Sequence, residues 1–454
     1  MADRLMDFLS IQLERDPTVA NRFRGGVHPD DSKHTSTQAI SRLQPAESLI
    51  LSLSQHIGAP SRPEVSAGDR VLKYQPIASP GGFVSMSLHA PTSGTVKAVE
   101  PAPHPSGRFV TAIIIEPDGL DEVFDLTDKA DPGLERGPEA WKEVIRDSGI
   151  VGMGGAAFPT HVKLSPPEDK PIDMIVANGV ECEPYLTADH RLMLESPDEI
   201  LGGLFLAMEI LGAKKAVVAI EANKPDAAEV MRKTDLPEGV SVEILPVMYP
   251  QGAEKQLIQA LTGREVPTGG LPMDVGIVVQ NVGTLAAMNH AVKEGRPMVD
   301  RIMTLGGSLP NGPGNYLVSI GTPLTHIVEQ TGGFKGPASR LINGGPMMGQ
   351  ALAGLESPVT KGTSGLLAFG PGELRPLRQR ACIRCGSCVS VCPASLMPHT
   401  LGNMAEFQLF DQLREFNISD CIECGSCAYV CPADRNMVQF IRHGKAELLA
   451  MVGK

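Results

Sequence analysis

CIRCGSCVSVCP at residues 382–393 returns as CIECGSCAYVCP at residues 421–432, so the chain carries one cysteine motif twice. Each copy has the pattern C-x₂-C-x₂-C-x₃-C-P, which is typical of loops that bind a [4Fe–4S] cluster. In proteins with two such clusters, three cysteines of one copy bind three irons and the fourth reaches the cluster of the other copy. The repeat therefore predicts a C-terminal ferredoxin-type domain that holds two clusters.

The spacing rule gives each cluster four cysteine ligands. The first set is Cys382, Cys385, Cys388 and Cys431, and the second set is Cys421, Cys424, Cys427 and Cys392. Zinc also binds C-x₂-C pairs, but it needs neither a third cysteine at the same spacing nor a following Cys-Pro. A disulfide framework is disfavoured because eight of the nine cysteines lie in the last quarter of the chain.

Length and composition narrow the class of protein. A chain of 454 residues is too long for one core, and its 42% hydrophobic and 20% charged residues are ordinary for a globular protein. The net charge of −12 and the lack of a basic run argue against nucleic acid as a partner. No apolar run is long enough to cross a bilayer, and thiolate-bound clusters need a reducing compartment. We expect a cytosolic chain that reaches a membrane only through partner subunits.

The sequence is typical of a multidomain α/β protein. Changes in composition predict a barrel-sandwich-like β domain over residues 1–125 and a Rossmann-like α/β domain over 126–295. A small β-grasp module is expected over 296–350, a Gly/Pro-rich linker over 351–376 and the ferredoxin-type domain over 377–454. A short helix is also expected near the start of the chain.

The N-terminal β domain resembles biotinyl and lipoyl carriers. Residues 65–72 and 89–96 have the pattern of that fold's paired hairpins. Carriers hold their cofactor on a lysine at a hairpin tip, but the corresponding tip here is Pro80-Gly81-Gly82-Phe83. We therefore expect a scaffold rather than a swinging arm.

The α/β domain is predicted from helical and strand patterns that alternate along the chain. Residues 197–211 have the apolar spacing of a helix, with Gly212 where helices commonly stop. Residues 172–177, 216–220 and 275–279 are the strand candidates.

A glycine-rich loop over residues 149–163 opens this domain. Its glycines can bring backbone N–H groups close to an anion or a flat ring, and Lys163 offers a positive charge suited to phosphate. The spacing of Gly152, Gly154 and Gly155 matches neither the dinucleotide fingerprint nor a P-loop. Taken alone, the loop favours a structural turn and a ligand site about equally.

Two polar segments favour the ligand site. Residues 178–184 and 280–284 each follow a predicted strand, which is where open α/β sheets bind ligands. Their polar side chains suit the ring edge, ribityl chain and phosphate of a flavin.

Together these segments resemble the flavin subunit of respiratory complex I. The likeness covers residues 152–163, 178–184, 249–254 and 281–284, followed by the β-grasp module and the cluster motifs in the same order. Residues 23–29, 55–60 and 89–96 narrow the choice among the families related to that subunit. The whole chain resembles the RnfC family, whose members are components of Rnf ion-translocating electron transport complexes.

The resemblance implies that FMN accepts a hydride from NADH and passes single electrons to the two clusters, then to a neighbouring iron–sulfur subunit. It implies a peripheral subunit at the cytoplasmic face of the bacterial inner membrane, with no general acid or nucleophile. The positions that would line the FMN and NADH site are Gly152, Gly154, Gly155, Phe158, Lys163, Asn178, Glu181, Glu183, Tyr249, Gly252, Glu254, Asn281 and Thr284.

Three positions depart from the complex I pattern. Val180 replaces a usual aspartate, Ala253 a glutamate and Gln280 an asparagine, so a polar contact to FMN is lost or changed at each. These changes keep open an iron–sulfur conduit with a vestigial flavin fold. A quinone-reductase A-type subunit shares the N-terminal and α/β patterns, but that family lacks the eight-cysteine tail. Cys182 is expected to be a small buried hydrophobe.

Overall fold

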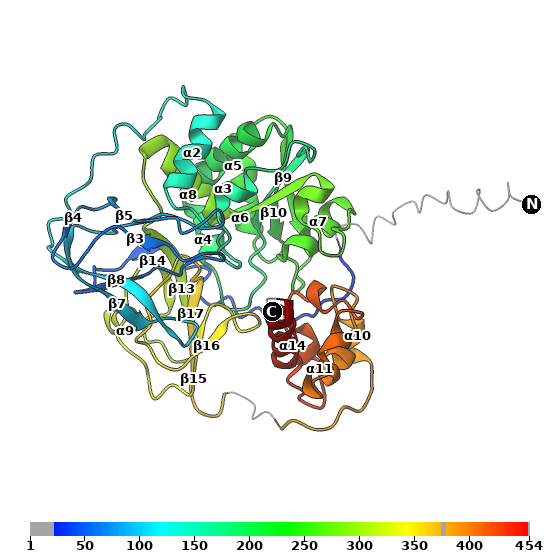
Figure 1. Ribbon diagram of the computed structural model, residues 1–454. Coiled ribbons are helices and arrows are strands. Elements are labelled where there is room, and N and C mark those ends of the chain that lie inside the picture. Colours follow the sequence, from blue (N-terminus) through cyan, green and yellow to red (C-terminus); the bar gives the residue numbers. More distant parts are fainter. Residues whose placement is uncertain (1–21, 374–377, 453–454) are drawn as a thin grey trace, which may run out of the picture.

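The computed structural model describes residues 22–373 and 378–452 of the chain. The short helix predicted near the start falls on residues outside that part. Figure 1 shows a β module beside an α/β domain, a module built on a mixed sheet below both, and a helical domain that contains the cysteine motifs.

The β module is two small sheets around one apolar core. Its strands are β2 (Leu49–Ser52), β3 (Arg62–Pro63), β4 (Arg70–Val71), β5 (Pro76–Ser79), β6 (Leu88–His89), β7 (Gly94–Pro103) and β8 (Phe109–Pro117). One sheet has the order β2-β8-β7-β4 and the other β3-β5-β6. The predicted hairpins meet where Val71 pairs with Gly94. The turn between β5 and β6 carries Phe83, which is 80% exposed.

The α/β domain contains a parallel sheet with the order β11-β10-β9-β12. The strands are β9 (Met174–Gly179), β10 (Lys215–Glu221), β11 (Val240–Leu245) and β12 (Ile277–Asn281). The three predicted strands are confirmed within two residues at each end, and β11 was not predicted. The helices of this domain are α2 (Pro138–Asp147), α3 (Thr160–Lys163), α4 (Ala188–Glu195), α5 (Pro197–Leu211), α6 (Pro225–Lys233), α7 (Glu254–Thr262) and α8 (Val282–Glu294), with the short helix η1 (Pro272–Val275).

Helices cover both faces of this sheet. Buried residues of α2, α5, α6 and α8 form one core with the sheet, and α7 packs on the other face. Helix α5 has the predicted bounds, and Gly212 ends it in the left-handed conformation with φ of 65°.

The mixed-sheet module has six strands in the order β1-β14-β13-β17-β15-β16. They are β1 (Ser41–Arg42), β13 (Asp300–Gly307), β14 (Gly314–Ser319), β15 (Arg340–Asn343), β16 (Gln350–Leu352) and β17 (Gly365–Phe369), and α9 (Leu324–Gln330) packs against the sheet.

Two predicted boundaries need correction here. Strand β17, inside the predicted linker 351–376, is buried along its whole length and lies between β13 and β15. Its uninterrupted apolar run marks an inner strand, although Gly and Pro surround it. Strand β1 precedes the β module in the chain but pairs with β14, so residues 41–42 belong to this sheet.

The C-terminal domain, called the cysteine domain below (residues 378–452), is built from short helices. They are α10 (Ser387–Ser390), α11 (Pro398–Glu406), α12 (Phe410–Leu413), η2 (Ile418–Asp420), α13 (Ser426–Tyr429) and α14 (Met437–Val452). Leu401, Leu413, Ile418 and Ile441 form its core. Among the residues that the structure describes, no helix is both long and apolar enough to span a bilayer.

Candidate functional site

The order of the parallel strands creates a site at the carboxyl ends of β9 and β12. The chain adds β10 and β11 on one side of β9 and then returns to place β12 on the other side. Ligands of open α/β sheets bind where the strand order reverses in this way. Asn178, the next-to-last residue of β9, is paired directly with Asn281, the last residue of β12.

The glycine-rich loop lies against this point. The backbone N–H of Gly152 donates to the carbonyl of Phe158 at 2.7 Å, which closes the loop on itself. The N–H of Met153 donates to Thr284 Oγ1 at 2.8 Å, which ties the loop to the first turn of α8. Gly152, Phe158 and the sequence-distant Thr284 therefore lie close together.

The loop's glycines provide a smooth backbone surface. Gly154 has φ of +73°, and a Cβ there would lie 3.0 Å from Asn281 Nδ2, so a side chain is disfavoured twice. A Cβ at Gly155 would meet no atom within 4 Å, so the loop faces open space at that position.

Lys163 has a partner within the protein. Its Nζ lies 2.6 Å from Glu254 Oε1 and donates to the carbonyl of Val279 at 3.1 Å. Lys163 and Glu254 therefore pair with each other, and Lys163 is less available for phosphate than its sequence context suggested.

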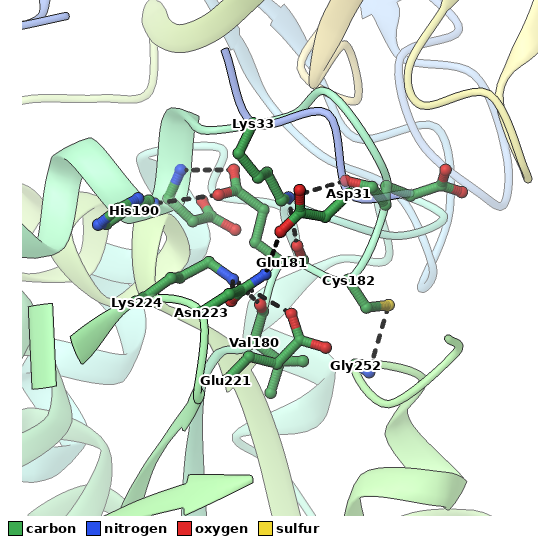
Figure 2. A network of polar contacts seen from close by, with 12 residues as sticks. Asp31, Lys33, Val180, Glu181, Cys182, His190, Glu221, Asn223, Lys224 and Gly252 are labelled. Carbon is green, nitrogen blue, oxygen red and sulfur yellow. Dashed lines mark hydrogen bonds and ion pairs between the residues drawn. The ribbon is translucent and has the colours of Figure 1, made fainter. Parts of the chain in front are cut away.

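The end of β9 and the loop after it are fixed by hydrogen bonds to several other parts of the protein. Asn178 Nδ2 donates to the carbonyl of Gly252 at 2.9 Å, and the carboxylate of Glu181 accepts from the N–H groups of Asp189 and His190 at the start of α4. Figure 2 shows Glu181 reaching toward His190. Glu183 accepts from the N–H groups of Met347 and Met348, which connects the loop to the mixed-sheet module. Burial raises the pKa of Glu183.

Asp189 was not identified from the sequence. Asn281 caps α8 through its Oδ1, while its Nδ2 donates to Asp189 Oδ2 at 2.6 Å. Burial, and then the nearby charge of Glu181, raise the pKa of Asp189 to about 7. No spacing pattern marks this residue, because its importance comes from contact with Asn281, 92 positions away.

Cys182 was expected to be a small buried hydrophobe, and it is half-buried, packed against the apolar cores on either side of it. Its sulfur accepts from the N–H of Gly252 at 3.4 Å, and burial raises the pKa of the thiol to about 12. At neutral pH the thiol is therefore protonated.

Several polar atoms at this end of the sheet have no protein partner. Gln280 is only 1% exposed, yet neither atom of its amide is hydrogen-bonded within the described part of the chain. The Thr160 hydroxyl, at the start of α3, is also buried and unpaired there. Val180 is buried in the apolar core under α7, so it offers no contact in place of the aspartate. Buried polar atoms without a protein partner, at the end of the sheet where the glycine-rich loop lies, are consistent with hydrogen bonds to a polar ligand such as FMN.

The eight motif cysteines line two separate cavities. One is lined by Cys382, Cys385, Cys388 and Cys431, and the other by Cys392, Cys421, Cys424 and Cys427. Each cavity thus receives three cysteines from one motif copy and the last cysteine of the other. We call the four cysteines of the first cavity the outer set and the four cysteines of the second cavity the inner set. No described group of three or more His, Cys, Asp or Glu side chains is arranged to hold a single metal ion.

The inner set lies against the α/β domain. Tyr249, which is 1% exposed, donates its hydroxyl to the carbonyl of Cys424 at 2.8 Å, and Gln256 Nε2 donates to the carbonyl of Pro393 at 3.3 Å. Val27, Tyr249 and Cys424 share one apolar cluster. Tyr249, predicted to line the nucleotide site, therefore also connects that domain to the inner cavity.

Four family models match this chain. They are the RnfC barrel sandwich hybrid domain at residues 21–120, the Nuo51 FMN-binding domain at 145–290, the SLBB domain at 303–351 and the 4Fe-4S dicluster domain at 377–432. The four-part fold expected from the sequence is thereby confirmed, as are its FMN-binding and dicluster classes.

Among solved structures, a NAD⁺-reducing [NiFe]-hydrogenase in the H₂-reduced state matches 69% of this chain and 61% of its own at 20% identity and a TM-score of 0.46. That likeness is too distant to bear on function.

Curated relatives match over nearly the whole chain. The C subunit of a proton-translocating ferredoxin:NAD(+) oxidoreductase complex of Clostridium ljungdahlii is 48% identical over 94% of this chain and 93% of its own length. A Na(+)-translocating counterpart of Acetobacterium woodii is 44% identical over 94% and 97%. The C subunit of an ion-translocating oxidoreductase complex of Pseudomonas aeruginosa is 46% identical over 95% of this chain but only 56% of its own. The chain therefore belongs to the RnfC family, the C subunits of Rnf ion-translocating oxidoreductase complexes.

Proposed function

We propose that this chain is the electron-input subunit of a membrane-bound, ion-translocating NADH:ferredoxin oxidoreductase. It would exchange electrons between NADH, FMN and two [4Fe–4S] clusters. The observation that carries the proposal is the contact between Tyr249 of the α/β domain and Cys424 of the inner set. This contact joins a nucleotide-type site to a cysteine cavity within one chain.

The residues around the glycine loop would hold the nucleotides. A bound FMN would supply the conversion of a two-electron hydride from NADH into the single electrons that iron–sulfur clusters accept. The backbone at Gly155 leaves room for a flat ring or a phosphate, and the unpaired amide of Gln280 offers a donor and an acceptor. Asn178, Glu181 and Asn281 hold the surrounding loops in place through their own hydrogen bonds. No side chain is needed as a nucleophile.

The cysteines of each cavity would be the ligands of one cluster, in the crossed arrangement expected for this motif. Backbone N–H groups of Arg384, Leu396 and Glu423 donate to cysteine sulfurs at 3.4 Å, and such bonds stabilise the ligand sulfur's negative charge. Because the inner set contacts the α/β domain, it would be the first of the two sets to exchange electrons with that domain.

The outer set would face a neighbouring iron–sulfur subunit. Cys385 is exposed, and Ile383 beside it is 67% exposed. Both curated relatives of matching length are named as subunits of ion-translocating ferredoxin:NAD(+) oxidoreductase complexes. By analogy, the chain would sit peripherally at the cytoplasmic face of the bacterial inner membrane and touch the membrane only through partner subunits.

The proposal is tested by anoxic purification followed by visible spectroscopy. We expect flavin bands and cluster absorption, both of which bleach when NADH is added. Clusters without flavin, with no response to NADH, would contradict the enzyme and support an iron–sulfur conduit with a vestigial flavin fold.

A further inference from the structure

An N-terminal strap, residues 22–42, crosses the molecule before the β module begins. Gly26 N–H donates to the carbonyl of Val391 in the cysteine domain at 2.9 Å, and Val27 pairs with Tyr249 of the α/β domain. The carbonyl of Thr35 accepts from Asn315 of the mixed-sheet module at 3.0 Å. One short segment thus contacts three parts of the protein.

The strongest contact of the strap is made by Lys33. Its ammonium donates to the backbone carbonyls of Glu181 at 2.7 Å, Glu183 at 2.9 Å and Leu186 at 2.6 Å. Figure 2 shows Lys33 above the loop that carries Glu181 and Cys182. An ammonium has three N–H donors, so all of its hydrogen-bonding capacity is spent on this one loop.

The loop needs such support because its backbone is strained. Glu181 and Tyr185 both have positive φ, 47° and 69°, in a region that residues with a side chain seldom occupy. Carbonyls that converge on one point also repel one another. A positive charge at that point removes the repulsion, and its charge-assisted hydrogen bonds are stronger than neutral ones.

A second ammonium holds the start of the loop. Lys224 is 1% exposed, and its Nζ donates to the carbonyl of Val180 at 2.7 Å and contacts Glu221 at 3.2 Å. Lys224 therefore has a buried carboxylate beside it, whereas the three acceptors of Lys33 are all backbone carbonyls. Figure 2 shows Lys224 and Glu221 together below the loop. Of the two lysines, Lys33 acts more directly on the geometry of residues 181–186.

We propose that Lys33 is a positioning residue for nucleotide binding, which fixes the loop that follows β9 and carries Glu181 and Glu183. The proposal rests on the proposed function for its effect on FMN, but its effect on the loop is independent of that function. Removing the ammonium should release the carbonyls, let Glu181 and Tyr185 relax and loosen the hold of Glu181 on α4.

The test uses the full chain with Lys33→Ala, Lys33→Met and a control, Lys97→Ala. Lys97 is an exposed lysine of β7 whose partner is Glu116. Two quantities are measured: amide hydrogen exchange over residues 181–190, and the FMN dissociation constant from flavin fluorescence. We expect faster exchange and a dissociation constant raised about tenfold, a change that about 1.4 kcal/mol of lost binding energy produces. The control should match the wild type.

Chemical rescue separates this role from general support of the fold. Ethylammonium, which donates hydrogen bonds, should restore slow exchange and FMN affinity to Lys33→Ala but not to Lys33→Met, whose side chain fills the space. Tetramethylammonium, with equal charge and no N–H, should restore neither.

Three results would overturn the proposal. The first is wild-type exchange together with an FMN dissociation constant within about twofold in both variants, less than about 0.5 kcal/mol. The second is equal rescue by both cations, and the third is failure of both variants to fold even with ethylammonium. If the wild type itself binds no FMN, the proposed function fails, and the exchange data still decide the role of Lys33.

Discussion

The two motif copies, residues 382–393 and 421–432, have nearly the same sequence and backbone but different surroundings. Arg384 and Glu423, at equivalent positions, have φ of 56° and 58°. Ile383, in the first copy, is 67% exposed, whereas Ile422, at the equivalent position of the second copy, packs against the apolar cluster that contains Tyr249. Arg384 is exposed, while Glu423 is bonded to Arg442 and Lys445. Motif spacing therefore places four cysteines around each cavity, while the neighbouring domains determine how exposed each cavity's surroundings are.

The largest expected effect comes from breaking one cage at a time. Cys392→Ala should remove the cluster held by Cys421, Cys424 and Cys427, and Cys431→Ala should remove the other. Anoxic iron and sulfide analysis should then find about half of the wild-type content in each variant. If spectroscopy showed that Cys392→Ala instead lost the centre bound by residues 382–388, the crossed assignment would be wrong.

The next effect contrasts equivalent isoleucines. Ile422→Asp places a charge among apolar side chains at the domain contact and should cost about 3 kcal/mol or more of unfolding free energy. Ile383→Asp should change it by less than about 0.5 kcal/mol, because that side chain is exposed. Anoxic denaturant unfolding, followed by cluster absorbance, measures both. Equal losses in the two variants would show that the two sets have similar surroundings.

A smaller effect is expected where the α/β domain meets the inner set. Tyr249→Phe leaves the Cys424 carbonyl without its partner and should cost about 1–3 kcal/mol in the same unfolding assay. The matched control is Tyr429→Phe, since Tyr429 is 54% exposed on α13. A Tyr249→Phe protein as stable as the control would mean that the hydroxyl contributes nothing to the contact.

The smallest effect concerns the charges at equivalent positions. Glu423→Gln should cost about 0.5–1 kcal/mol and Arg384→Gln close to nothing. Burial opposes ionisation of Glu423, but Lys445 and Arg442 outweigh it and lower its pKa. Its contribution should be complete above the usual glutamate pKa and be lost as pH falls through the lowered value. Unfolding measured at two pH values checks this, and a larger difference between Glu423→Gln and wild type at the lower pH would contradict it.

Features that depend on local spacing could be predicted from the sequence. The cysteine repeat, helix α5 with Gly212 and the three central strands are of this kind, because their signals lie within a few residues. Strand β17 was missed because its short apolar run resembles any buried segment, and only its pairing with β13 and β15 makes it a strand.

Features that depend on distant contacts could not be predicted. Lys33 acts on carbonyls 148 to 153 positions away, and the sequence gives it no pattern. Lys163 was expected to face a phosphate, but Glu254, 91 positions away, lies 2.6 Å from it. In both cases the sequence shows that a charged side chain is present, but only the fold determines which group it contacts.

The order of the two sets is tested most directly by following NADH-driven cluster reduction in the cage variants. With the outer set broken in Cys431→Ala, we predict that NADH still reduces the remaining cluster as fast as in the wild type. With the inner set broken in Cys392→Ala, we predict that the remaining cluster is reduced far more slowly or not at all. Rapid reduction of the outer cluster in Cys392→Ala would contradict the account.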